Sequence, residues 1–332
     1  MSRHHLRGLA ACVSAALLAS GVAGCGQSQL RSDAELDTSA YPALSTTQVD
    51  DVLDSLAHTL ETADKDRTSE SLQARLENPA LSMRLSQYRL NAANKDLAVP
   101  SLVADPVAVS VSKGPAWPRA ILDVTGAADG ATPLVLVLRQ ADARSPYRLW
   151  QWMHLLPKQS VPPTAAVAAG SQLRDAADGK DLAMSGQQAK DAWAKSVTDA
   201  DAQKSAGIDT DEFMANIRDE QKNWQQAIGQ TGTLSYTVSP ADDLLVFSDE
   251  DGGALVATSY TYRTDVAIKS GEGGIEMGGD VGALLGEGGK VTGKAHWTYT
   301  ITVLIHVPAA DADNASTRVI AGEKVLTEAT RD

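Results

Sequence analysis

The chain of 332 residues has little cysteine, few aromatic residues and a deficit of basic residues. Its two cysteines, Cys12 and Cys25, both lie among the first 25 residues, so the rest of the chain has no thiol and cannot form a disulfide. A secreted domain without disulfides must rest on its hydrophobic core, and about 300 residues are enough for one large core or two medium cores. We therefore expect a globular protein that is stabilised by its core.

Acidic residues outnumber lysine and arginine, 42 against 29, which gives a formal net charge of −13. Without residues 1–24, which contain Arg3 and Arg7 and no acidic residue, the net charge becomes −15. Lys and Arg side chains that neutralise phosphates supply most of the affinity for nucleic acid, and an acidic surface repels phosphates and anionic lipid headgroups. The charge therefore excludes nucleic acid as a partner.

The N-terminus contains an apolar run, residues 9–22, behind the basic residues Arg3 and Arg7. This run is shorter than the roughly 20 apolar residues that a membrane-spanning helix needs, and Ser14 and Ser20 interrupt it. A basic segment followed by a short apolar run is typical of a secretion signal. The sequence therefore predicts export.

The apolar run ends at Val22, Ala23, Gly24 and Cys25, which resemble the lipobox of bacterial lipoproteins. The resemblance implies that the sulfur of Cys25 carries a diacylglyceryl group and that cleavage precedes this residue. Residues 1–24 would then be a lipoprotein signal peptide and residues 25–35 a polar tether, with the protein anchored on the extracytoplasmic face of the cell membrane. An ordinary cleaved signal peptide and an uncleaved anchor helix are the alternatives.

The segment from residue 36 to residue 157 is predicted to form an N-terminal module of helices followed by strands. Apolar residues at intervals of three and four predict an amphipathic helix over residues 47–60, and a second helix is expected to begin near Pro79. The period then changes to two, which is typical of antiparallel strands. The predicted strands are residues 107–111, 120–125, 134–138 and 147–155.

The same order of helix and then strands recurs after a linker, residues 158–207, that contains a polar helix over residues 187–197. Asp209 and Glu212 resemble a capping box, and they precede a helix with an apolar face. The strands predicted after this helix are residues 233–238, 244–247, 255–268, 295–307 and 318–327. Residues 208–332 are therefore predicted to form a C-terminal α+β module.

Helices followed by antiparallel strands, found twice, resemble the NTF2-like, or cystatin-like, cone, in which a curved antiparallel sheet packs on helices. The resemblance implies an α+β fold of two modules. The chain also resembles uncharacterised actinobacterial lipoproteins, through the residues around Trp117–Pro118, residues 133–138 and residues 146–149. That family has no assigned activity, so this resemblance implies no catalytic residues.

Two segments match catalytic or metal-binding motifs in part, but the residues around them favour other structures. Ser110 and Lys113 match the spacing Ser-x-x-Lys, but the alternating valines around them predict a strand that places the two side chains on opposite faces. Asp249 and the following acidic residues precede two glycines, which favours a hairpin turn over a calcium loop. We therefore predict no catalytic residue, no metal and no cofactor.

Two clusters remain as candidate sites. Tyr260, Tyr262, Trp297 and Tyr299 share one face of the long strands and form either core or the lining of a pocket. The glycine-rich segment 271–293 contains Ile275, Met277, Leu284 and Leu285, which form either a packed hairpin extension or an apolar lip for a partner.

The sequence favours a non-catalytic binding or scaffolding lipoprotein of the cell envelope. Its expected partners are the membrane, through the lipid on Cys25, and an envelope protein or a small apolar ligand. A chaperone for a lipid or another small molecule is an alternative. A hydrolase or isomerase that uses a cone pocket is another, and Asp265 is the only acidic residue within the strand over residues 255–268.

Overall fold

The computed structural model describes residues 41–127, 132–313 and 316–332. The predicted signal peptide, Cys25 and the predicted tether lie outside these residues. The described residues belong to one compact unit, Asp37–Asp332. The fold is mixed α+β, as the sequence predicts, and it is built on a curled antiparallel sheet.

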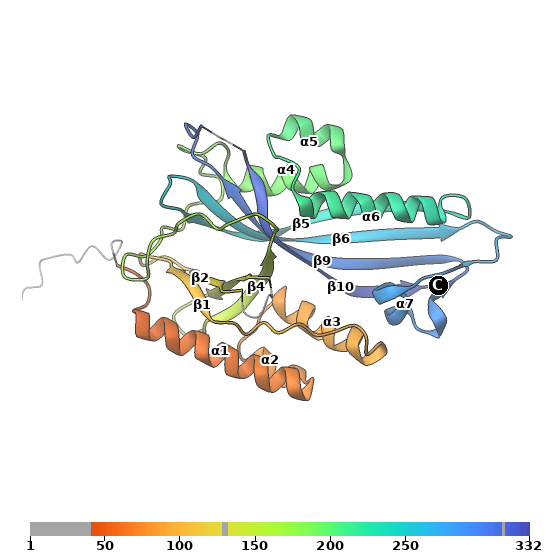
Figure 1. The fold of residues 1–332 in the computed structure, drawn as a ribbon, viewed down its shortest axis with the longest axis horizontal. Coiled ribbons are helices and arrows are strands. Elements are labelled where there is room, and N and C mark those ends of the chain that lie inside the picture. The colour runs from red at the N-terminus through yellow and green to blue at the C-terminus, as the bar shows by residue number, and fades with distance from the viewer. Residues whose placement is uncertain (1–40, 128–131, 314–315) are drawn as a thin grey trace, which may run out of the picture. The chain divides into compact units, whose positions relative to one another are not determined.

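Eight antiparallel strands form the main sheet, in the order β1-β2-β3-β4-β10-β9-β6-β5 (Figure 1). Their bounds are β1 Pro106–Val111, β2 Arg119–Thr125, β3 Leu134–Gln140, β4 Arg148–Leu155, β5 Gly232–Ser248, β6 Ala254–Ile268, β9 Lys294–Val307 and β10 Arg318–Arg331. These eight strands overlap the segments that the sequence predicts as strands. The two strands expected over residues 233–247 are one strand, β5, with an irregular register between Pro240 and Leu244.

A short junction between β4 and β10 joins the two groups of strands that the sequence assigns to separate modules. Only Leu155 and His154 of β4 are in register with β10, opposite Ala321 and Gly322. Gly322 lies directly under the ring of Phe213, which a Cβ atom at this position would approach to 2.9 Å. The junction therefore needs a residue without a side chain, so that a helix can pack across it.

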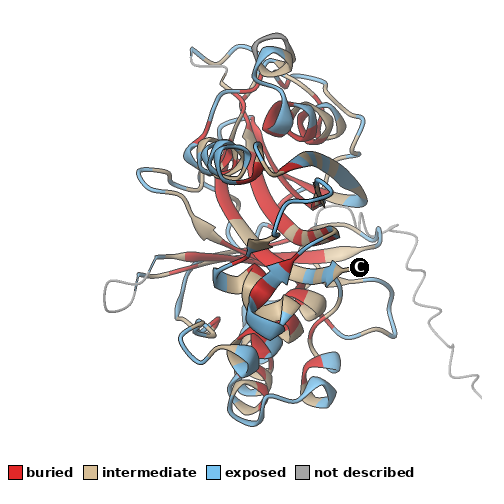
Figure 2. Ribbon diagram, turned by 90° about the vertical axis from the view of Figure 1, so that its right-hand side faces the viewer, coloured by how far each residue is buried: buried red, intermediate tan, exposed pale blue. Residues whose placement is uncertain are grey.

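The sheet curls so that its two halves face each other across a shared apolar cluster. This cluster combines residues of β2, β3 and β4 with residues of β5, β6, β9 and β10, among them Leu122, Trp150, Phe247 and Leu304. In Figure 2 the strands are coloured as buried where these halves meet, whereas the outer sides of the helices are exposed. Strands twist because of the steric demands of L-residues, and the resulting curl lets the inner faces of the two halves bury apolar side chains against each other.

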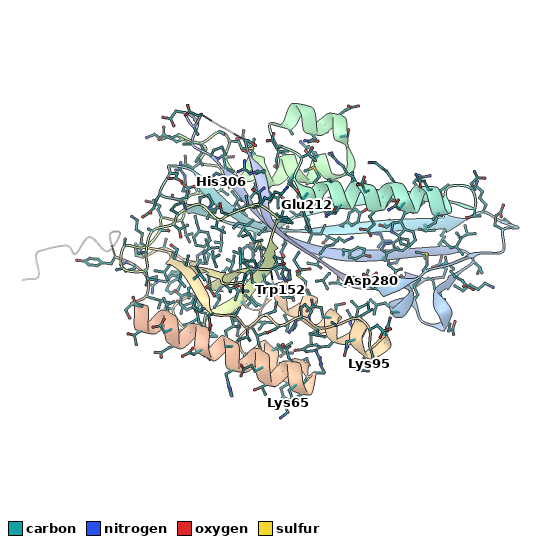
Figure 3. All side chains as sticks on the ribbon, viewed as in Figure 1. Lys65, Lys95, Trp152, Glu212, Asp280 and His306 are labelled. Carbon is teal, nitrogen blue, oxygen red and sulfur yellow. The ribbon has the colours of Figure 1, made fainter. Side chains whose placement is uncertain are left out.

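Helices α1 (Thr46–Asp66), α2 (Ser69–Gln73) and α3 (Ala80–Ala93) cover the outer face of β1 to β4. Helix α1 begins at Ser45, whose side chain and that of Gln48 form a capping box. Trp152 of β4, labelled in Figure 3, belongs to the cluster between this face and the helices. Arg84 of α3 is buried and pairs with Asp64 of α1, which fixes these helices to each other.

Helices α4 (Gly186–Thr198), α5 (Ala200–Ala206) and α6 (Glu212–Ile228) belong to the other half, where the cluster that contains Trp193 and Ile217 covers one face of β6 and β9. The N-cap of α6 is Asp211, whose carboxylate accepts a hydrogen bond from the backbone N–H of Met214 at 2.7 Å. The prediction of Asp209 as the cap was wrong, because the backbone of Asp209 pairs instead with Thr317. None of the described helices is long and apolar enough to cross a membrane.

The glycine-rich segment folds into β7 (Ile275–Glu276), α7 (Gly279–Leu285), a 3-10 turn η2 (Glu287–Gly289) and β8 (Lys290–Val291). Both α7 and α3 lie beside the part of β10 that extends beyond β4 (Figure 1). The hydroxyl of Ser86 donates to the carbonyl of Leu326, and Arg89 donates to the carbonyl of Thr327. These helices therefore cover an edge that would otherwise expose unpaired backbone groups.

Candidate functional site

An apolar groove of about 680 Å³ lies at one end of the N-terminal half of the sheet. Helix α1, strand β1, the end of β2, the end of β4 and the segment 160–167 line it. Its lining residues are Thr46, Val49, Asp50, Val107, Ala108, Val109, Val124, Thr125, Pro133, Leu155, Ser160, Val161, Pro162, Pro163, Thr164, Ala166 and Val167. Pockets of roughly 300–1,000 Å³ with mainly apolar linings are typical of small-molecule sites.

The first turn of α1 forms one wall of the groove. The capping box at Ser45 fixes where the helix begins, and the 3.6-residue repeat then places Thr46, Val49 and Asp50 on the same side. Val49 is buried, so this wall is continuous with the core beneath it. The position of the wall is therefore set by the core and does not depend on a ligand.

The segment 160–167 forms the opposite wall, and hydrogen bonds hold its backbone in place. The buried hydroxyl of Ser110 on β1 donates to the carbonyl of Ala165 at 2.9 Å, and the N–H of Glu250 donates to the carbonyl of Pro163 at 2.8 Å. Gly170, three residues beyond the segment, has φ of 68°, and a Cβ atom there would lie 2.9 Å from the Cβ of Lys113. The backbone of the wall is therefore held in place at Pro163 and Ala165.

The described lining of the groove is mainly apolar. Among the described residues that line the groove, Asp50 is the only ionisable one, and the remaining polar side chains are the hydroxyls of Thr46, Thr125, Ser160 and Thr164. General acid–base catalysis needs a positioned group whose pKa is matched to proton transfer, usually with a partner that orients it. Valine, proline and alanine side chains offer instead a surface for an apolar ligand.

The four aromatic residues that the sequence offers as core or pocket lining are buried between the sheet and the helices. The hydroxyl of Tyr260 donates to the carbonyl of Lys190 on α4 at 3.0 Å, and its ring lies 4.5 Å from that of Trp193. Trp297 packs against Trp224 of α6 at 5.4 Å, and the rings of Tyr262 and Tyr299 are 6.2 Å apart. The cluster occupies the core of this half, and Tyr260 also borders a surface cleft, with Asn78 and Asp243.

The four residues of the predicted lip pack towards the same core. Met277 is buried, and Ile275, Leu284 and Leu285 are half-buried against that core. The segment that contains them covers Tyr299, whose hydroxyl donates to Asp280 at 3.4 Å; Figure 3 labels Asp280. Packing of this kind is typical of a structural extension of the hairpin.

A polar pocket of about 410 Å³ lies at the far end of the long strands, on the face opposite α6, and it contains Asp265 and His296. Both carboxylate oxygens of Asp265 accept hydrogen bonds from Arg263 at 2.6–3.0 Å, and this interaction lowers the pKa of Asp265. The ring of His296 lies 2.9 Å from the hydroxyl of Thr330. Arg263 therefore engages both oxygens of the carboxylate that the enzyme alternative invokes.

Sequence reasoning missed Asp123, an isolated carboxyl group on β2 that is 2% exposed. Its Oδ1 has no hydrogen-bond partner among the described residues, and burial raises its pKa to about 7. The adjacent cavity, between α1 and β1 to β3, measures about 40 Å³, which can hold a water molecule and no substrate. The signal in the sequence was an acidic residue within the apolar run of residues 120–124.

The motifs that the sequence analysis set aside have structural roles. The hydroxyl of Ser110 lies 2.7 Å from that of Ser171 and is buried, so it belongs to the contacts that hold the groove. One oxygen of Asp249 accepts from the backbone N–H groups of Asp251 and Gly253, as in a tight hairpin turn. Within the described part of the chain, no three His, Cys, Asp or Glu side chains lie close enough to hold a metal ion.

Comparison of the chain with models of protein families, with curated proteins and with solved structures gives no match.

Proposed function

We propose that the protein is a membrane-anchored lipoprotein of the extracytoplasmic face that acts as a non-catalytic binding protein of the cell envelope. The observation that carries the proposal is the apolar groove beside α1, whose preformed walls and mainly apolar described lining suit an apolar ligand or an apolar segment of an envelope protein. The lipobox-like sequence at Cys25 supplies the anchor.

The position of the groove along the chain supports this proposal. Tyr41 follows Cys25 by sixteen positions, and a chain of that length spans at most about 55 Å. Thr46, on the wall of the groove, follows Tyr41 by five residues, which span at most about 18 Å. A lipid on Cys25 would therefore keep the groove close to the membrane surface, where apolar ligands and envelope proteins are concentrated.

We also propose that the two halves of the fold are modules of the same type. In each half, helices pack on one face of an antiparallel group of strands, and we interpret the halves as two NTF2-like cones that share one sheet. The short junction of two register pairs between β4 and β10 supports this interpretation, since the pairing within each half is much more extensive. The groove belongs to the N-terminal cone.

Two measurements test the proposal separately. Replacement of Cys25 by serine should release the folded protein from the membrane fraction, and retention after a salt and carbonate wash would contradict lipid anchoring. Replacement of Ala166, an exposed residue of the groove wall, by tryptophan should block the groove. Ala168→Trp is the matched control, because Ala168 is exposed two residues further on and does not line the groove.

The readout for the groove is the apolar material that co-purifies with the protein, extracted and identified by mass spectrometry, together with the binding of a fluorescent fatty-acid probe. We expect Ala166→Trp to lose both and Ala168→Trp to keep both. Equal binding by the two variants would contradict the groove as the binding site, whatever the result with Cys25→Ser.

A further inference from the structure

Exposed large hydrophobic side chains occur on the edge strand β1 and on the segments next to its C-terminal end. Among the described residues they are Tyr41, Val107 and Trp117, which are 58%, 73% and 38% exposed. Val107 belongs to the edge strand β1, and Trp117 to the loop between β1 and β2. The backbone carbonyl of Tyr41 accepts from the N–H of Gly114, directly after β1, at 3.0 Å. We call these three residues the edge strip.

The residue types of the edge strip are those that favour the boundary between water and lipid. Tryptophan and tyrosine have an apolar ring with a polar group and are enriched at the level of lipid headgroups. The guanidinium of Arg119 lies 4.3 Å from the centre of the Trp117 ring, and Lys113 lies in the same loop as Trp117. Although the chain as a whole is acidic, these two cations provide local partners for lipid phosphates.

Addition of a strand from another protein is the other use of an exposed edge, and β1 is poorly suited to it. Pro106 has no N–H group, and the register of β1 shifts between Pro106 and Ala108, which are features that blunt edge pairing. The other end of the strand is already occupied, because Val111 and Lys113 exchange backbone hydrogen bonds with Ser171. The exposed part of β1 therefore offers side chains rather than a backbone ladder.

The length of chain between the edge strip and Cys25 identifies the surface that covers it. Tyr41 is the first described residue, and a span of at most about 55 Å connects it to the predicted lipid attachment site. The bilayer that holds the lipid is thus the apolar surface within reach. This step rests on the proposed function.

We propose that the edge strip is a second membrane contact, in which Trp117 and Tyr41 insert at headgroup level of the bilayer that anchors Cys25. Val107 belongs both to the edge strip and to the lining of the groove. Docking through the strip therefore turns the groove towards the bilayer, so that an apolar ligand passes between membrane and groove with little exposure to water.

Tryptophan fluorescence tests this proposal directly. Trp117 is the most exposed of the six tryptophans, since Trp224 is half-buried and the other four are buried. The full-length protein, purified from membranes, is mixed with phosphatidylcholine vesicles whose acyl chains carry bromine close to the headgroup. We expect quenching in the wild-type protein, loss of the quenching in Trp117→Phe, and weaker quenching in Tyr41→Ser and Val107→Ser.

Thr237→Ser is the matched control, because Thr237 is exposed on β5, which lies at the opposite edge of the sheet, and we expect it to leave the quenching unchanged. Flotation of the same samples reports anchoring through Cys25, independently of the quenching. A protein that floats without quenching keeps its anchor and overturns the edge strip. A protein that does not float overturns the anchor, and the strip is then judged by quenching at millimolar lipid.

Quenching of equal size in wild type and Trp117→Phe would also overturn the proposal, since it would arise from another tryptophan. The same holds if Trp117 emission shifts with protein concentration and not with lipid, because the strip would then contact a second copy of the chain.

Discussion

The two halves of the sheet differ in how many of their faces are covered. In the N-terminal half, β3 has five consecutive buried residues, because helices cover one face and the curled sheet covers the other. In the C-terminal half, the first eight residues of β5 alternate between exposed and more buried positions. A strand that is buried on both faces needs a continuous apolar sequence, whereas a strand with one solvated face alternates.

The uncovered face of the C-terminal half has a polar surface that extends across the strands. Thr237 of β5, Arg263 of β6 and Thr298 of β9 lie in register with one another, and none of them is buried. Hydroxyl and charged groups in such rows remain hydrated and need no covering helix. The tolerance of a strand to substitution therefore depends on whether one or both of its faces are buried, and not on its length. Four predictions test this difference between the halves.

The largest effect is expected on the helix-covered face of the C-terminal half. Replacement of residues 271–293 by an Asn-Gly turn between β6 and β9 removes Met277, Val281 and Val291, which are buried, and should lower the free energy of unfolding by about 5 kcal/mol. Urea denaturation measures the change. Glu272→Ala, in the exposed part of the same segment, is the control, and a loss below about 1 kcal/mol for the replacement would show that the segment is a passive loop.

The second prediction tests whether the two halves of the sheet unfold as one cooperative unit. Trp152 is fully buried in the N-terminal half, and Trp152→Ala should lower the free energy of unfolding by about 3–5 kcal/mol. Because one sheet and one shared cluster join the halves, hydrogen exchange in α6 of the other half should accelerate as well. Trp117→Ala serves as the exposed control. If exchange in α6 did not change, the halves would be independent folding units.

A smaller effect follows from the buried carboxyl group in the N-terminal half. Burial raises the pKa of Asp123 to about 7 in the folded state, above its value in the unfolded chain. The folded protein is therefore more stable at low pH, where Asp123 is protonated, and it loses this stability as the pH rises towards 7. Asp123→Asn should abolish this decrease in stability at higher pH, because asparagine has no charge to bury. We expect the variant to be about 2–4 kcal/mol more stable than the wild type at pH 8, with little difference at pH 4.

Denaturation across this pH range measures the difference, with Asp265→Asn on the open face as its control. The pKa of Asp265 is lowered by Arg263, so its contribution has the opposite sign and is lost as pH falls. A wild-type and Asp123→Asn pair with parallel pH profiles would contradict a buried, uncompensated carboxylate.

The smallest effects are expected when threonine and valine are exchanged for each other at one position in each half. Thr237→Val, on the open face of β5, should change the free energy of unfolding by less than about 0.5 kcal/mol. The reverse exchange in the closed half, Val135→Thr, buries a hydroxyl without a partner in β3 and should cost about 1–3 kcal/mol. Similar costs at both sites would remove the distinction between the open and the closed half.

Local sequence patterns predicted most elements of the fold. The repeat of Val49, Leu56 and Leu60 predicted α1, and the alternation after residue 232 predicted the long strands, because both depend on interactions within a few residues. The cap of α6 was placed two residues early, at Asp209. Which of two nearby carboxylates caps a helix depends on the strand beside it, and here Thr317 engages the backbone of Asp209.

The candidate site was less accessible to sequence reasoning. The groove combines α1, β1, the ends of β2 and β4, and residues 160–167. Its two walls, α1 and residues 160–167, lie more than 100 residues apart in the chain, so no single segment of the sequence predicts the groove. Asp123 was missed for a related reason. Its neighbours along the strand are apolar, but only the packing of Leu56 and Leu136 around it decides that its carboxyl group is isolated from water.

The sequence by itself determined the acidic surface, the core without disulfides, the predicted anchor at Cys25 and the type and order of the main elements, because charge, composition and hydrophobic period are local properties. Tertiary structure decided that the two groups of strands join through His154 and Leu155 and that the aromatic cluster belongs to the core. It also decided that an apolar groove opens beside the edge strip. Strand pairing and burial depend on contacts between distant segments, and their free energies are defined only once the chain has brought those segments together.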